Sequence, residues 1–200
     1  MTPSLRNTRL AKLDAPTSPY TALILAHAGL ERINLGHRTT SLISAPQIHY
    51  AVGQGALGIE TRAGDEETES LVRQIGHWPT EWRTKAERAC LRKLEGGCSV
   101  PVGVDSTFTP SAEGSGSAHA GSLSLTGTVT SLDGSEHVVF TVADRALASA
   151  DDAEAVGLEV AEGLIAGGAG EILAAIAASK NAKGTVQGDE VLQQHKAAAS

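Results

Sequence analysis

The sequence predicts a mixed α+β and α/β protein. We expect the incomplete remnant of an α/β domain, followed by a small α+β domain whose three-stranded antiparallel sheet is packed by helices. The short apolar run Thr21–Ala26 is typical of a strand covered on both faces, as in a parallel sheet. Three later strand candidates, with the hairpin signal Asp133–Gly134 between the last two, indicate an antiparallel sheet. Helical patterns lie on both sides of these candidates.

The first fifty residues contain one helix and one strand candidate. The helical stretch carries Leu10 and Leu13, and the segment His27–Leu30 follows the apolar run, where α/β sheets place loops that face ligands. A single strand cannot form a sheet by itself. We therefore expect apolar residues at Leu23–Leu25 to be exposed, and those at Leu57–Ile59 with them. Such surfaces favour self-association or pairing with another chain.

The middle of the chain predicts a glycine-rich segment and two helices. Ala51–Glu60 holds three glycines and then alternates like a strand, and Glu66–Ile75 has the pattern of an amphipathic helix. A second helix is expected from Thr80, as its N-cap, to about Leu94. The strand candidates that follow are Val100–Val104, Ser122–Ser131 and His137–Ala143. The Ser- and Gly-rich piece Thr109–Ser122 predicts a long flexible connection.

The last part of the chain predicts two helices and a mobile tail. Ser149 begins a capping-box-like sequence. The helix after it carries apolar residues at four-residue steps, namely Val156, Val160 and Leu164. Gly167–Gly168 is expected to end this helix, and a second helix carries Ile172, Leu173 and Ile176. The polar and Ala-rich residues 181–200 have no apolar face, which predicts a tail.

Composition excludes several classes of function. The chain is 41% apolar and 20% charged, as in soluble globular proteins. Its net charge of -7 argues against nucleic acid and membrane surfaces as partners, and no apolar run approaches the ~20 residues that cross a bilayer. The two cysteines, Cys90 and Cys98, form neither a disulfide framework nor a zinc-binding spacing. We expect no metal site and a reducing, cytoplasmic location.

Cys98 stands out because two glycines precede it. Gly96 and Gly97 can adopt backbone angles closed to other residues, which would present the thiol at the tip of a loop. The alternative is a small buried hydrophobic residue, which is the commoner state of a free cysteine. The residues by themselves leave both alternatives open and favour the second.

Three blocks of sequence, taken together, carry a resemblance to a known family. They are Thr8–Asp14, Ala51–Glu60 and Leu94–Pro101, and Leu23–Leu30 fits between the first two. Their order and spacing resemble the C-terminal part of the porphobilinogen deaminase family, also called hydroxymethylbilane synthase. The resemblance covers roughly residues 5–179.

The resemblance implies a transferase of heme and porphyrin biosynthesis. The family condenses four porphobilinogen units into the linear tetrapyrrole hydroxymethylbilane and releases ammonia. Its covalent dipyrromethane cofactor is held by a thioether to the cysteine that Cys98 matches, which favours the first alternative for this residue. Arg6, Arg9 and Arg38 match family arginines that face the cofactor or substrate, and arginine binds the acetate and propionate groups of pyrroles bidentately. The implied partners are porphobilinogen and the growing pyrrole chain, and family members are usually monomeric.

The resemblance also implies a division of the chain into four parts. Residues 1–52 would be the remnant of the family's second domain, and residues 53–78 an inter-domain crossing strand and helix. Residues 79–180 would form the C-terminal α+β domain with the cofactor-attachment loop, and residues 181–200 the flexible tail.

The sequence departs from the family in two places. The stretch from Arg6 to Leu10 is three residues shorter than the family pattern, so Arg6 is less well supported than Arg9. The family's catalytic aspartate belongs to a part that precedes the matched residues, so no catalytic residue is assigned. We expect a truncated chain that is inactive, or nearly so, by itself.

Two other functions stay open at this point. The chain could be a non-enzymatic fragment that acts as an interaction or regulatory module. A free-thiol redox or metal-delivery protein that uses Cys90 and Cys98 is the weakest hypothesis, because Cys90 falls on a predicted helix with no third soft ligand nearby.

Overall fold

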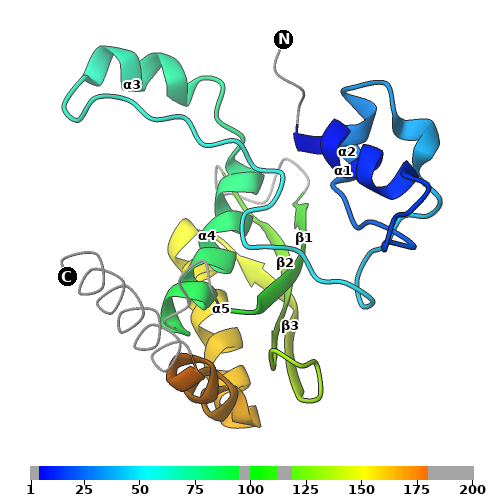
Figure 1. Cartoon of the computed structure of the whole chain (residues 1–200). Helices are drawn as coiled ribbons and strands as arrows, with labels where there is room; N and C mark the ends of the chain where they lie inside the picture. Colours follow the sequence, from blue (N-terminus) through cyan, green and yellow to red (C-terminus); the bar gives the residue numbers. More distant parts are fainter. Residues whose placement is uncertain (1–4, 95–99, 112–118, 180–200) are drawn as a thin grey trace, which may run out of the picture. The chain divides into compact units, whose positions relative to one another are not determined.

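The computed structural model describes residues 5–94, 100–111 and 119–179, with the backbone alone for residues 5–7 (Figure 1). The chain divides into two compact units, Met1–Gln47 and Ile48–Ser200. The predicted tail, 181–200, lies outside the described residues.

The first unit is helical in its described part. It contains helix α1 (Leu5–Asp14), the short helix α2 (His27–Glu31) and a single 3₁₀ turn, η1 (Gly36–Arg38). The helix predicted around Leu10 and Leu13 is confirmed. Leu10 and Leu30 are buried, and they mark the small apolar centre of this unit.

The predicted strand Thr21–Ala26 is wrong. The segment is extended, but it has no strand partner within residues 5–47, and 72% of Ile24 is exposed. An apolar run of this length becomes a strand only where another strand satisfies its backbone N–H and C=O groups. The run therefore keeps a strand-like sequence without a sheet, and part of its apolar surface faces solvent.

The second unit begins with extended chain and helix α3 (Glu66–Arg73). Asp65 caps this helix, because its carboxylate accepts a hydrogen bond from the backbone N–H of Thr68. The predicted amphipathic helix is confirmed, but its apolar side is not covered, and Leu71 and Ile75 are more than half exposed. Leu57 is 91% exposed, which agrees with the surface expected there.

Helix α4 (Trp78–Lys93) begins three residues earlier than predicted. His77, not Thr80, is its N-cap, and Pro79 lies in the first turn, where a missing N–H costs nothing. The Nδ1 atom of His77 lies 2.8 Å from Oγ1 of Thr80, so Thr80 takes part in the start of the helix without being the cap.

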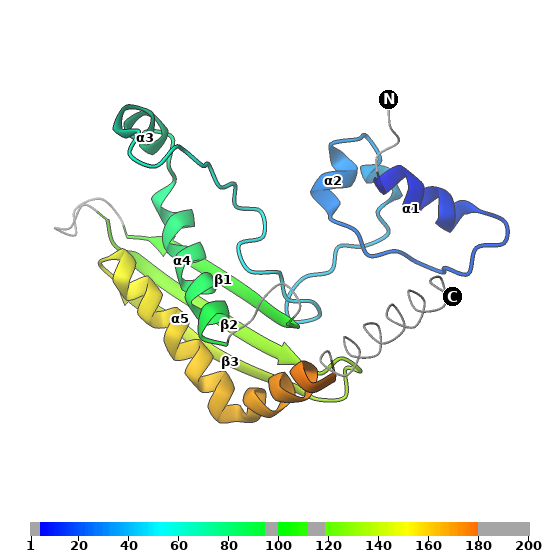
Figure 2. The same cartoon turned by 60° about the vertical axis from the view of Figure 1, so that its left-hand side comes forward.

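A three-stranded antiparallel sheet forms the centre of the second unit. Its strands are β1 (Val102–Pro110), β2 (Gly121–Thr130) and β3 (His137–Leu147), in the order β1-β2-β3. The predicted sheet is confirmed, although β1 reaches into the piece that was expected to be a flexible connection. Helices α4 and α5 cover one face of the sheet (Figures 1 and 2).

The β2–β3 hairpin forms at the predicted Asp133–Gly134 turn. Gly134 has a φ of 76°, which glycine adopts without strain. The Asp133 carboxylate accepts hydrogen bonds from the hydroxyls of Ser131 and Ser135, and these bonds lower the pKa of Asp133 to about 2. The turn is therefore fixed by local polar contacts, which is why the sequence predicts it well.

Helix α5 (Ala150–Leu164) supplies most of the second layer. The Ser149 hydroxyl accepts from the N–H of Asp152, so the predicted cap is confirmed. The predicted apolar stripe is fully buried at Val156, Val160 and Leu164. These residues share one core with the inward side chains of the sheet, such as Leu123, Leu125 and Val129.

The predicted break at Gly167–Gly168 is confirmed, because Gly168 has non-helical backbone angles and separates two helical segments. The chain continues through a π-type turn, η2 (Ile165–Ala169), and Gly168, with a φ of 104°, produces a kink. Residues 170–179 are again helical and bury Ile172 and Ile176. By length and composition Ala150–Ser179 could cross a membrane, but the burial of α5 on the sheet accounts for its apolar face as a core helix.

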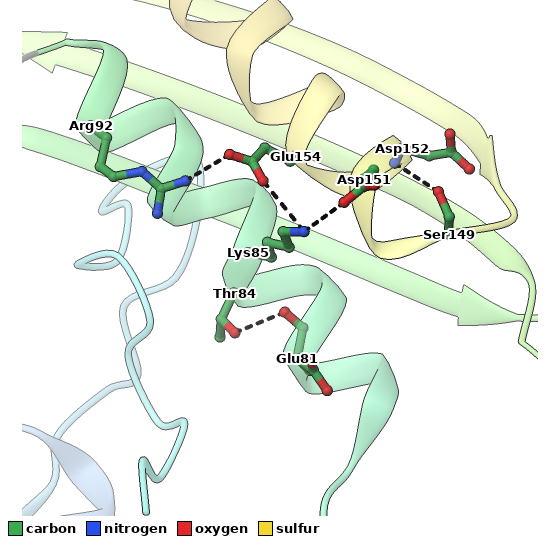
Figure 3. Close-up of polar contacts among 8 residues, drawn as sticks. All are labelled: Glu81, Thr84, Lys85, Arg92, Ser149, Asp151, Asp152 and Glu154. Atoms are coloured by element: carbon green, nitrogen blue, oxygen red, sulfur yellow. Dashed lines mark hydrogen bonds and ion pairs between the residues drawn. The ribbon is translucent and has the colours of Figure 1, made fainter. Parts of the chain in front are cut away.

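Charged side chains line the contact between α4 and α5 (Figure 3). Lys85 Nζ lies 2.9 Å from Oδ1 of Asp151 and 3.3 Å from Oε2 of Glu154, whose other oxygen pairs with Arg92 at 3.0 Å. Asp151 and Arg92 are exposed, and Lys85 and Glu154 are half-buried, so solvent still screens these pairs and each contributes modestly to stability. They join side chains of α4 to the first two turns of α5.

The α4–α5 contact depends on Gly157. A Cβ at this position would overlap the backbone carbonyl of Ala86, which cannot move without displacing α4. We expect Gly157→Ala to lower the free energy of unfolding by about 1–3 kcal/mol through overpacking, measured by urea denaturation.

Gly170→Ala is the matched control, since Gly170 is helical and nothing lies within 4 Å of the place that a Cβ would take there. This change should leave the protein as stable or about 0.5–1 kcal/mol more stable. Equal stability of Gly157→Ala and wild type would contradict the close contact.

Candidate functional site

The first unit carries a positive charge within an acidic chain. Residues 1–47 contain five basic and two acidic side chains, whereas the whole chain has a net charge of -7. A local excess of positive charge attracts negatively charged ligands. The first unit is therefore suited to anions, and carboxylates are among them.

Arg38 lies in η1 and forms a two-point ion pair with Asp14. Its Nη2 lies 2.6 Å from Oδ1 and its Nη1 3.2 Å from Oδ2. This contact, chiefly its hydrogen bonds, lowers the pKa of Asp14 and raises the pKa of Arg38. The side chain of Arg38 is 35% exposed, so it can still meet a ligand. Sequence reasoning assigned no role to Asp14, because its partner is 24 residues away.

The other two predicted arginines lie on α1. Arg9 is exposed, and Arg6 lies one helical turn before it, with its side chain outside the described part of the structure. The structure thus brings Arg38 to the end of α1, at Asp14, and leaves Arg9 facing solvent. His27 contributes to the neighbourhood of η1, since its Nδ1 lies 3.3 Å from the hydroxyl of Thr39.

Cys98 lies outside the described residues, between Leu94, the C-cap of α4, and Val102, which begins β1. The other cysteine, Cys90, is buried on α4, and burial raises the pKa of its thiol to about 12. A buried thiol with a raised pKa is a poor nucleophile and a poor soft ligand. This weighs against the redox and metal-delivery hypothesis, which needs both cysteines.

Sequence reasoning missed Glu87, a buried carboxylate on α4. Glu87 is 5% exposed and accepts hydrogen bonds from the backbone N–H of Gly53, at 2.7 Å, and from the hydroxyl of Ser106, at 2.5 Å. Arg83 Nε lies 3.9 Å from the same carboxylate. The sequence signal for this site is a charged residue on the apolar side of α4, next to Ala86 and one helical turn before Cys90.

Within the second unit, Glu87 ties the glycine-rich segment to α4 and β1. Gly53 and Gly55 have φ values of 72° and 86°, so the segment turns in a way that suits glycine. Tyr50 forms a bridge with Val104 of β1, and a cavity of about 230 Å³ lies between residues 50–54, α4 and β1. The glycines act through conformation, and the carboxylate holds their turn in place.

Metal chemistry has no support in the described residues. Within residues 5–94, 100–111 and 119–179, no group of three or more His, Cys, Asp or Glu side chains could hold a metal ion.

The fold and the charged groups define a class: a two-unit protein in which a basic helical unit precedes a small α+β domain. Residues 82–166 match the family model of the porphobilinogen deaminase C-terminal domain, and residues 5–70 match its dipyrromethane cofactor binding domain. The chain belongs to the porphobilinogen deaminase family.

Curated relatives agree with this assignment. The chain is 48% identical over 167 residues to the porphobilinogen deaminase of Synechococcus elongatus, a match that covers 84% of this chain and 47% of that protein. It is 46% identical over 169 residues to that of Debaryomyces hansenii, covering 84% of this chain and 44% of the relative. For that of Schizosaccharomyces pombe the identity is 42% over 166 residues, with 83% and 48% covered. The chain spans about half the length of the curated relatives it matches.

We expect Glu87→Gln to loosen the glycine-rich segment. The amide keeps the size of the side chain but removes the charge that strengthens both hydrogen bonds, so the free energy of unfolding should fall by about 1–3 kcal/mol. The backbone N–H of Gly53 should exchange faster with deuterium, measured by NMR.

Glu81→Gln on the same helix provides the control, because Glu81 is exposed. It should leave the exchange of Gly53 unchanged. Unaltered protection of Gly53 in Glu87→Gln would show that the carboxylate does not hold this segment.

Proposed function

We propose that this chain binds the carboxylates of a pyrrole chain and of the dipyrromethane to which that chain is attached. In this role it serves the condensation of porphobilinogen into hydroxymethylbilane. The observation that carries the proposal is the ordered guanidinium of Arg38 in a basic unit, within the residues that match the cofactor binding domain. Arg9 and Arg6, on α1, would supply further contacts to acetate and propionate groups.

The described residues fit such a ligand. Every pyrrole unit carries two carboxylates, and guanidinium groups bind carboxylates while staying charged. Arg38 offers N–H donors beyond those that Asp14 uses, and Arg9 is accessible to solvent. The excess of positive charge in the first unit favours an anionic ligand over a neutral one.

Cys98 is the proposed attachment point. A pyrrole whose aminomethyl group has lost ammonia has an electrophilic methylene carbon, and the thiolate forms a carbon–sulfur bond to it. When bound, the dipyrromethane supplies the position to which the growing pyrrole chain is attached. Cys90 is a poor alternative because its thiol is buried. A thiol with this role has to stay reduced, which supports the proposed cytoplasmic location.

We further propose that the 200 residues by themselves are inactive or nearly so. The resemblance to the family assigns proton transfer to an aspartate that none of these residues matches. Loss of a positioned acid–base group costs about 10²–10⁴ in rate.

The purified 200-residue chain should therefore carry a bare Cys98 thiol and form no measurable hydroxymethylbilane from porphobilinogen. Intact-mass spectrometry reports the first point, and a coupled assay of tetrapyrrole formation the second.

Cys98→Ser is the control for the attachment point. An added dipyrromethane mass on the wild-type chain that disappears in Cys98→Ser would establish the site and refute the expected bare thiol. Turnover at the ordinary rate of a complete enzyme would refute the expected inactivity.

A second candidate function, an interaction module, is favoured by the exposed apolar residues. Leu57 is 91% and Ile59 57% exposed, and single chains rarely leave neighbouring apolar side chains uncovered. We propose that this segment associates with another polypeptide, a second copy of the chain included.

Light scattering after size exclusion should show the chain growing beyond a monomer as its concentration rises. The double variant Leu57→Gln with Ile59→Thr should shift the equilibrium toward the monomer. Leu132→Gln, at an exposed residue of the β2–β3 turn, should not. A monomer at every concentration would remove the support for this candidate.

A further inference from the structure

We propose that the Asp133–Gly134 turn is a site of spontaneous isoaspartate formation, and that Ser131 and Ser135 keep this reaction slow in the folded chain. The turn joins β2 to β3, and residues 132–136 are exposed to solvent. Among aspartate bonds, the one before glycine is the most prone to this reaction, because glycine has no Cβ to hinder attack by its backbone nitrogen. Asp133–Gly134 is the only such pair in the sequence.

The reaction is a rearrangement of the main chain. The Gly134 nitrogen forms a bond to Cγ of the protonated Asp133 carboxyl group and gives up its proton, and one water molecule leaves. Water then opens the resulting five-membered succinimide ring at either carbonyl carbon. One opening restores aspartate, and the other leaves the chain linked through Cγ, which is isoaspartate. The water lost in the first step returns in the second, so the reaction needs no oxidant, reductant or cofactor.

Both reacting groups are held by neighbours in the turn. The backbone carbonyl of Ser131 accepts a hydrogen bond from the Gly134 N–H at 3.1 Å. The Ser131 hydroxyl donates to Oδ1 of Asp133 at 2.6 Å. Ser135 donates to the same oxygen from its hydroxyl, at 2.8 Å, and from its backbone N–H, at 3.1 Å. The nitrogen and the carboxylate therefore have to leave these partners before a bond can form between them.

The same contacts keep the carboxylate ionised. Hydrogen bonds from Ser131 and Ser135 lower the pKa of Asp133 to about 2. No charged side chain in the described part of the structure pairs with Asp133, so these hydrogen bonds account for the change. An ionised carboxylate has no hydroxyl group to leave as water, so only the neutral acid reacts. Above the pKa, each unit by which the pKa falls makes the neutral acid about tenfold rarer.

Isoaspartate at this turn would affect the sheet. It adds one carbon to the main chain between β2 and β3, and the turn determines the register of a hairpin. The nearest pairs of the ladder are Thr130 with His137 and Val129 with Val138. Val129 is fully buried, so a change of register here would reach the core. The two serine hydroxyls thus preserve the sheet chemically as well as shape its turn.

The test ages the 200-residue chain in heavy-oxygen water at mildly acidic pH. Peptide mapping by mass spectrometry then measures isoaspartate and the uptake of heavy oxygen at Asp133. We expect the double variant Ser131→Ala with Ser135→Ala to form isoaspartate about tenfold faster than wild type, because the pKa of Asp133 returns toward its ordinary value. Ser124→Ala is the matched control and should age like wild type, since it removes a hydroxyl that donates to a different aspartate, Asp144, at 3.2 Å.

A free peptide of residues 130–137 provides the unfolded reference. It should react about tenfold faster than the full chain, or more, because it lacks the ordered contacts of the turn. Equal rates in wild type, the double variant and the peptide would overturn the protection by the serines. Absence of both isoaspartate and heavy oxygen at Asp133 in all three would overturn the site itself.

Two further variants separate protection from simple opening of the hairpin. Ser135→Ala by itself leaves every contact of Ser131 in place and should age at an intermediate rate, whereas a wild-type rate would overturn the role of Ser135. Asp133→Asn reaches the same succinimide by losing ammonia, without needing a protonated carboxyl group. It should lose ammonia more slowly in the folded chain than in the matching peptide, because the Ser131 carbonyl still holds the Gly134 N–H. Equal loss in chain and peptide would show that this contact does not protect the turn.

Discussion

The close packing of α4 and α5 on one face of the three-stranded sheet is the constraint on which the second unit depends. The two helices meet where Gly157 faces the backbone of Ala86, and the side chains of Val160 and Leu164 lie over Gly127 of the central strand. Small residues at these points let the layers approach closely enough to exclude water. With only 3% aromatic residues in the chain, the core combines this closeness with a few large rings, among them Trp82, Phe108 and Phe140.

The same packing determines where a charged side chain can lie on α4. One side of α4 faces the core, and the next position around the helix places Glu87 at the boundary, where it reaches both β1 and the turn at Gly53. A carboxylate is costly to bury unless its oxygens accept hydrogen bonds, and here both oxygens do. Glu87 therefore couples the glycine-rich segment to the rigid layers, and the segment that contains Cys98 starts from the end of the same helix.

How far the sequence predicts this molecule depends on the range of the interactions involved. The Asp133–Gly134 hairpin, the Ser149 cap and the stripe from Val156 to Leu164 arise from neighbours within a few residues, and the sequence predicts all three. Thr21–Ala26 has the composition of a strand, but a strand also needs a partner that local sequence does not reveal. Asp14 with Arg38, and Glu87 with Gly53, are 24 and 34 residues apart, so neither contact has a local signature. The expectation for Cys98 stays a prediction, since residues 95–99 lie outside the described structure.

An exposed arginine is a weak ligand for a carboxylate, because water competes for its donors and its long side chain has to be ordered on binding. Two features of the first unit act against these losses. The local excess of basic residues raises the concentration of anions near it, and Asp14 orders the guanidinium of Arg38 while occupying one edge of its donors. Asp14 neutralises part of this positive charge, yet the unit stays positive because Arg6, Arg9, Lys12 and Arg32 remain. The unit can therefore combine attraction over distance with a fixed direction at contact, which a lone surface arginine cannot do.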